Sequence, residues 1–118
     1  PLAMAVANAV LNEIDTNFLD KVKKISYYFF AKLEDLVKKH QNVLSLVRGR
    51  GLMLGLKCKV SNKDFQKVLA KNGLLTVTAG DNVIRLLPPL IVNKDQIDEA
   101  LKIISNTAKF FKDIKFIK

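Results

Sequence analysis

An arginine inside an otherwise apolar run is the residue of this sequence best suited to bind a ligand. Arg85 follows Val83 and Ile84 and precedes two leucines and two prolines. In a regular strand, Val83, Arg85 and Leu87 share one face. A guanidinium buried there needs an anion, because an unpaired buried charge is very unfavourable. Two hypotheses follow: an internal salt bridge, with Asp81 the nearest acid in sequence, or a planar fork that grips a substrate carboxylate through two charge-assisted hydrogen bonds.

A glycine-rich run from Gly49 to Gly55 invites comparison with a phosphate-binding loop. Its last glycine comes one position too late for the dinucleotide-binding fingerprint, and a strand rather than a helix follows it. We therefore expect these glycines to permit a bend or bulge between two strands, where a side chain would clash. Arg48 and Arg50, on either side of Gly49, are expected to pair with nearby acids or with another subunit.

The sequence shows no set of residues typical of nucleophilic, acid–base or metal catalysis. The single histidine, His40, has no ligand partner at metal-binding spacing. We expect it at the surface, at the end of a helix where cations are favoured. The single Cys58 forms no internal disulfide, which favours a reducing, cytoplasmic environment. We expect no catalytic residue and no metal site in this chain.

Composition places the chain among ordinary globular domains. Its 118 residues are 49% hydrophobic and 26% charged, with a net charge of +9. The lysines are spread along the sequence, so the charge permits contact with nucleic acid or an anionic membrane without requiring it. No apolar run reaches the length of about 20 residues that spans a bilayer. Residues 109–118 are basic and amphipathic, which fits either a helix lying on a membrane or one docked on its own domain.

The spacing of apolar residues predicts an α+β fold. A nearly all-apolar helix is expected at residues 1–14, and because the chain starts at Pro1 we expect a piece of a longer protein. The further elements expected are helices at 16–40, 63–71 and from 93 to the end, and strands at 43–48, 52–60, 74–78 and 83–87. Connections this short favour a small antiparallel sheet covered by helices on one face.

Two short signals mark helix ends. Asn93 is the expected N-cap of the last helix, and Gln96 stands at the position from which a capping box reaches back. Asn72 and Gly73 form a typical stop for the short helix before them.

Four segments together resemble the class III aminotransferases. They are Pro-Leu-Ala at 1–3, Val-Arg-Gly-Arg-Gly-Leu-Met-Leu-Gly at 47–55, Gly-Leu-Leu at 73–75 and Thr-Ala-Gly-Asp-Asn-Val-Ile-Arg-Leu-Leu-Pro-Pro-Leu at 78–90. The resemblance is greatest to the acetylornithine aminotransferases and covers about the last third of such an enzyme. It implies that residues 15–118 are the C-terminal small domain of a fold-type-I enzyme, and that residues 1–14 link it to a large cofactor domain absent here.

The resemblance also implies a reaction. Such enzymes use pyridoxal phosphate to move an amino group from N-acetylornithine to 2-oxoglutarate in arginine biosynthesis, and they work as cytoplasmic homodimers. Arg85 matches the family arginine that binds the substrate α-carboxylate. The cofactor-binding residues of the family lie upstream of Pro1, so this chain alone is expected to be inactive, with no nucleic-acid or membrane partner.

Other substrates and another class of function stay open at this point. Ornithine, 4-aminobutyrate and succinyl-diaminopimelate aminotransferases share the glycine-rich run and the carboxylate-binding arginine, and what distinguishes them lies mostly outside these residues. The alternative from another class is a basic, non-enzymatic module that binds nucleic acid or anionic membrane through its lysines.

Overall fold

The computed structural model describes residues 16–117, and the predicted order of elements within that range is confirmed. The elements are α2 (Thr16–Lys39), β1 (Leu44–Arg50), β2 (Met53–Cys58), α3 (Asn62–Lys71), β3 (Val77–Ala79), β4 (Val83–Leu86) and α4 (Lys94–Ile117). The helix expected at residues 1–14 lies outside the described residues. None of the described helices is long and apolar enough to cross a membrane.

The four strands form one antiparallel sheet in the order β1-β2-β4-β3. The glycine-rich run is confirmed as a place where side chains would clash, since a Cβ on Gly49 would lie 2.1 Å from the Met53 carbonyl oxygen. Strand β1 nevertheless continues through Gly49 to Arg50, so the turn lies at residues 51–52. The irregularity in pairing falls between Leu44 and Leu46 instead.

The strand expected at residues 74–78 is shorter and begins later, at Val77. The end of α3 explains this correction. The amide of Gly73 donates to the Ala70 carbonyl and that of Leu74 to the Leu69 carbonyl, the pattern that closes a helix with a glycine. The amide of Leu74 is therefore bound to the helix and is not available for pairing with β4.

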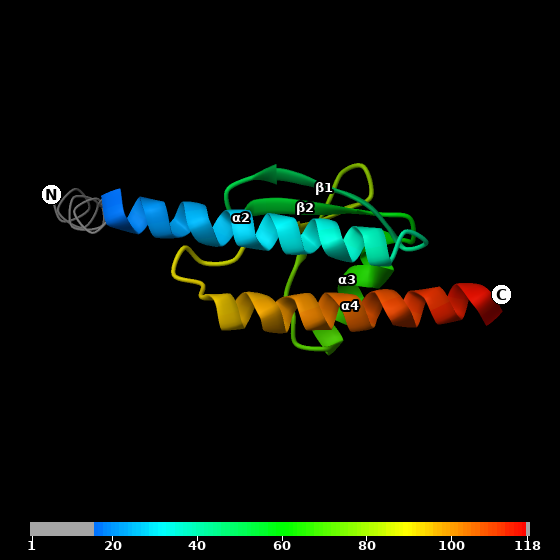
Figure 1. Cartoon of the computed structure of the whole chain (residues 1–118). Helices are drawn as coiled ribbons and strands as arrows, with labels where there is room; N and C mark the ends of the chain where they lie inside the picture. Colours follow the sequence, from blue (N-terminus) through cyan, green and yellow to red (C-terminus); the bar gives the residue numbers. More distant parts are fainter. Residues whose placement is uncertain (1–15, 118) are drawn as a thin grey trace, which may run out of the picture.

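Leu54 and Leu56 of β2, paired with Leu86 and Ile84 of β4, are buried beneath the helices, whereas Arg48 and Arg85 are exposed on the other side, so the sheet has a covered and an open face, as predicted. Helix α2 packs on β1, α3 packs on β3 and β4, and α4 packs against both other helices (Figure 1). The core between the layers contains Phe29, Leu33, Leu36, Leu54, Leu56, Phe65, Leu69, Ile84, Leu86, Ile97, Leu101 and Ile104. The opposite face of the sheet carries the residues considered below as a site.

Helix α4 starts with the predicted capping box and runs beside α2 (Figure 1). The Asn93 side chain accepts from the Gln96 amide at 2.8 Å, and the Asn93 amide donates to the Gln96 side chain at 3.0 Å. Further along, the rings of Phe111 and Phe65 are 5.4 Å apart. Phe111 of the C-terminal amphipathic segment therefore packs on its own domain.

The expectation that His40 lies at the surface is wrong. Its side chain is 8% exposed, and its Nε2 lies 3.0 Å from Ser105 Oγ of α4. The cause is tertiary, because α4 covers the last turn of α2. Burial lowers the pKa of His40 from its usual value, and the positive charges of Lys109, Lys112 and Lys39 lower it further.

We predict that the free energy of unfolding falls as pH is lowered from about 7.5 to about 5.5. Below its ordinary pKa, His40 binds a proton in the unfolded chain that the folded chain disfavours, so acid shifts the equilibrium towards unfolding. His40 is the single histidine, and His40→Gln removes this titration while keeping a polar group opposite Ser105. Chemical denaturation at several pH values should give a flatter dependence in the variant. An equal slope in both proteins would show that His40 is not responsible.

Candidate functional site

The open face of the sheet holds a row of four residues from its four strands. Arg48 of β1 lies opposite Gly55 of β2, Gly55 lies opposite Arg85 of β4, and Arg85 lies opposite Val77 of β3. Directly paired residues point to the same side of a sheet. The register therefore places two arginines on one face with a glycine between them.

Arg85 is exposed and borders a hollow of about 230 Å³. The hollow is lined by Arg48, Gly49, Met53, Leu54, Gly55, Val83 and Arg85. Among the side chains described, those of residues 16–114, and the backbone described with them, nothing forms a hydrogen bond or an ion pair with the Arg85 guanidinium. The expectation of a buried charge is thus wrong, and the described part of the chain contains no internal salt bridge for this residue. Its five donors face solvent and an open cavity.

Asp81 binds the other arginine of the hollow. Its carboxylate accepts from Arg48 at 3.0 Å and from Lys57 Nζ at 3.1 Å. The hydrogen bond from Lys57, followed by that from Arg48, lowers the pKa of the Asp81 carboxyl. The expectation that Arg48 pairs with a nearby acid is confirmed. Sequence reasoning did not find the role of Asp81 or Lys57, because the pairing depends on how β1, β2 and β4 are aligned.

Hydrogen bonds from the side chains of two asparagines, Asn62 and Asn82, stabilise the turn that carries Asp81. Asp81 and Asn82 have φ of 63° and 58°, a region that asparagine and aspartate tolerate better than most residues. The Asn82 side chain donates to the Cys58 and Val60 carbonyls at 2.7 and 2.8 Å and accepts from the Asn62 amide. The Asn62 side chain donates to two carbonyls on either side of the turn. This network fixes where Asp81 meets the sheet.

Gly55 makes the close approach of its neighbours possible. A Cβ built on it would lie 2.8 Å from Val83 Cγ1 and 3.5 Å from Arg48 Cγ. Because the first distance is shorter than a normal carbon contact, any side chain at position 55 would push Val83 aside. The stem of Arg48 therefore lies beside Gly55, in space that only a glycine leaves free.

The described residues do not by themselves fit pyridoxal phosphate, which is bound through a lysine kept out of water and a cradle for its phosphate. Every lysine side chain described between residues 16 and 114 is exposed except that of Lys57, which is partly exposed and paired with Asp81.

The Cys58 thiol is also unsuited to nucleophilic chemistry, since burial raises its pKa to about 12. No group of three or more acidic, histidine or cysteine residues that could hold a metal occurs in the described range.

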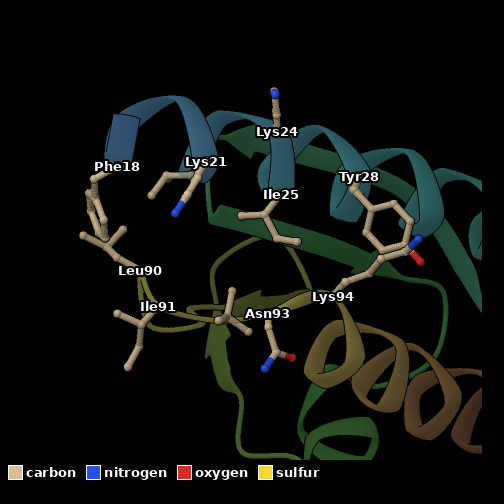
Figure 2. A pocket seen from close by; sticks show the side chains of 11 residues that line it. Phe18, Lys21, Lys24, Ile25, Tyr28, Leu90, Ile91, Asn93 and Lys94 are labelled. Atoms are coloured by element: carbon tan, nitrogen blue, oxygen red, sulfur yellow. The ribbon is translucent and has the colours of Figure 1, made fainter. Parts of the chain in front are cut away.

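A second, larger hollow of about 630 Å³ lies between the first half of α2 and the loop that leads into α4 (Figure 2). Its wall is mostly apolar and includes Ile25 and Ile91. In Figure 2, Lys94 and Tyr28 point towards one another, in agreement with a distance of 4.9 Å from the ammonium to the ring centre. The Tyr28 hydroxyl donates to Asp98. This hollow shares no lining residue with the hollow beside Arg85.

Comparison with known proteins identifies the family to which the sequence is similar. A family model described as aminotransferase class-III matches residues 1–108. Acetylornithine aminotransferase from Brucella melitensis biotype 1 is 44% identical over 110 residues, which are 92% of this chain and 27% of the relative. The enzyme of that name from Lactococcus lactis is 41% identical over 106 residues, with coverages of 88% and 28%. The chain thus spans little more than a quarter of these relatives.

Solved structures show the same similarity. The crystal structure of N-acetylornithine aminotransferase from Stenotrophomonas maltophilia aligns with a TM-score of 0.84 at 29% identity, covering 97% of this chain and 32% of that one. Ornithine delta-aminotransferase from Plasmodium falciparum aligns with a TM-score of 0.78 at 33% identity, covering 90% and 27%.

We predict that Gly55→Ala lowers the free energy of unfolding by about 1–2 kcal/mol, because the new methyl group must displace Val83 from its packed position. Chemical denaturation of the 118-residue chain measures this. The matched comparison is the same change in a Val83→Ala background, where the obstructing Cγ1 is gone and the loss from adding the methyl group should be clearly smaller. An equal loss in both backgrounds would mean that Val83 is not the obstacle.

Proposed function

Because this chain belongs to the class III aminotransferase family, we propose that it supplies the carboxylate-binding site of an aminotransferase. The observation that carries this proposal is Arg85, an exposed guanidinium at the edge of a hollow, with no partner among the side chains described for residues 16–114. A planar guanidinium binds a carboxylate through two parallel hydrogen bonds, and this geometry fixes orientation as well as position.

In the proposed reaction, an amino group passes from N-acetylornithine to 2-oxoglutarate. Arg85 holds the α-carboxylate of the amino acid or keto acid, so that its α-carbon is presented in one orientation. Pyridoxal phosphate, when bound, supplies the electron sink for such chemistry. We propose that the residues holding it belong to the longer enzyme and lie outside this chain, which alone is then inactive.

The choice of N-acetylornithine rests on the curated relatives, eight of which carry the name acetylornithine aminotransferase at 40–45% identity. Ornithine is the second candidate, because solved ornithine aminotransferases align with this chain at 33–34% identity. Both substrates carry the α-carboxylate that Arg85 is proposed to bind, so the role of Arg85 is the same in either case.

We also propose the domain arrangement that the family resemblance implies. Residues 15–118 are the C-terminal small domain, residues 1–14 connect it to the cofactor domain, and the whole enzyme acts as a cytoplasmic homodimer. The separate core enclosed by the sheet and α2, α3 and α4 supports a distinct small domain.

In the whole enzyme, Arg85→Ala should reduce kcat/KM for 2-oxoglutarate and for the amino donor by at least about tenfold, since a hydrogen bond to a charged group contributes about 1.5–3 kcal/mol. Arg85→Lys should recover little of this loss, because an ammonium group does not reproduce the two parallel bonds of the fork. Steady-state kinetics with each substrate varied in turn measure both changes.

Arg50→Ala is the matched control. Arg50 is an exposed arginine at the end of β1, but it does not line the hollow beside Arg85. This variant should keep kcat/KM within about twofold of the wild type, as expected for a surface substitution. If Arg85→Ala and Arg50→Ala behave alike, Arg85 is not the carboxylate anchor and the proposed function of this face is wrong.

A further inference from the structure

We propose that Asp81 is a positioning residue that sets how many carboxylates the Arg85 hollow can bind. It acts as an internal counter-ion for Arg48, so that Arg85 is the one guanidinium of the hollow left to a substrate. This inference rests on the proposed function, because it assumes that Arg85 binds a substrate carboxylate.

The starting point is that two arginines line the same hollow. Arg48 and Arg85 both pair with Gly55, from opposite sides of β2. Two strand spacings separate their Cα atoms, which is about 10 Å. Arginine side chains are long enough to bring both guanidiniums over the glycine between them. Without a counter-ion, the hollow would therefore offer two guanidinium groups that can bind carboxylates.

Asp81, in the β3–β4 turn, makes the two arginines unequal by binding Arg48. The Arg48–Asp81 distance is 3.0 Å, and Lys57 shares the same carboxylate at 3.1 Å. Arg85 has no comparable partner in the described range. The difference between the two arginines thus comes from one acid, whose turn is fixed by the hydrogen bonds of Asn82 and Asn62.

The consequence concerns substrates with two carboxylates. A dicarboxylate such as 2-oxoglutarate could bridge two free guanidiniums and lie across the hollow, with its α-carbon in the wrong place. While Asp81 binds Arg48, one end of the molecule meets the unpaired guanidinium of Arg85 and the other end meets a guanidinium already engaged by a carboxylate. The side chains of Arg48 and Asp81 are 47% and 59% exposed, so the pair is weak and its effect on binding is modest.

Inhibition of the whole enzyme tests this proposal, with glutarate and butyrate as unreactive acids that carry two carboxylates and one. Asp81→Asn should lower the inhibition constant of glutarate about two- to fivefold relative to that of butyrate, the range expected for one exposed ion pair. Asparagine suits the positive φ of position 81, so the turn should survive the change. Asp81→Glu, which restores the charge, should return the ratio towards the wild-type value.

Two double variants identify the cation responsible. Adding Arg48→Met to Asp81→Asn should abolish the gain for glutarate, whereas adding Lys57→Met should not, because Lys57 does not line the hollow. The proposal is overturned if Asp81→Asn leaves the ratio of the two inhibition constants unchanged, or if the gain survives Arg48→Met. Failure of the proposed function looks different: Arg85→Gln would then leave both inhibition constants at their wild-type values.

Discussion

The antiparallel register of β2 with β1 and β4 is the constraint on which the site depends. It places Gly55 directly between Arg48 and Arg85, and it brings the β3–β4 turn to the side of the sheet where Asp81 reaches Arg48 and Lys57. A slip of one residue in either pairing would move an arginine to the helix-covered face, where a charge would be buried among apolar side chains. The core therefore disfavours every slip by an odd number of residues, because such a slip exchanges the covered and open faces of a strand.

That penalty comes from the covered face. Leu54, Leu56 and Ile84 are almost fully buried beneath the helices, and their neighbours along each strand point to the open face. Large apolar residues on one face thus determine the position of charged residues on the other. The open face retains exposed apolar groups beside its arginines, including Met53 and Val77. Such a mixture of apolar surface and guanidinium groups is typical of a surface that binds another molecule.

Sequence reasoning predicted the elements whose signals are local. The apolar stripe of α2, the capping box at Asn93 and the strand around Arg85 depend on neighbours within a few positions of the chain. The family resemblance singled out Arg85 as the carboxylate ligand, and the structure places it at a hollow with its guanidinium unpaired among the described residues.

The features that were missed depend on contacts between distant segments. His40 is buried because α4 covers it across 65 positions of sequence, and Asp81 meets Arg48 across 33 positions. The exposure of Arg85 was also not predicted, because an apolar run in sequence does not reveal which face of a strand the helices cover. The late start of β3 follows from a helix ending that binds the Leu74 amide. That last feature is local, whereas for His40, Asp81 and Arg85 contacts between distant segments decided the outcome.

The most direct test of the central claim is a crystal structure of the whole enzyme with 2-oxoglutarate bound. The account predicts that both terminal nitrogens of the Arg85 guanidinium, or one of them together with Nε, lie within hydrogen-bonding distance of the α-carboxylate, while Arg48 keeps its ion pair with Asp81. A structure in which Arg85 instead pairs with an acid from the rest of the enzyme, and the α-carboxylate is bound by other residues, would contradict it.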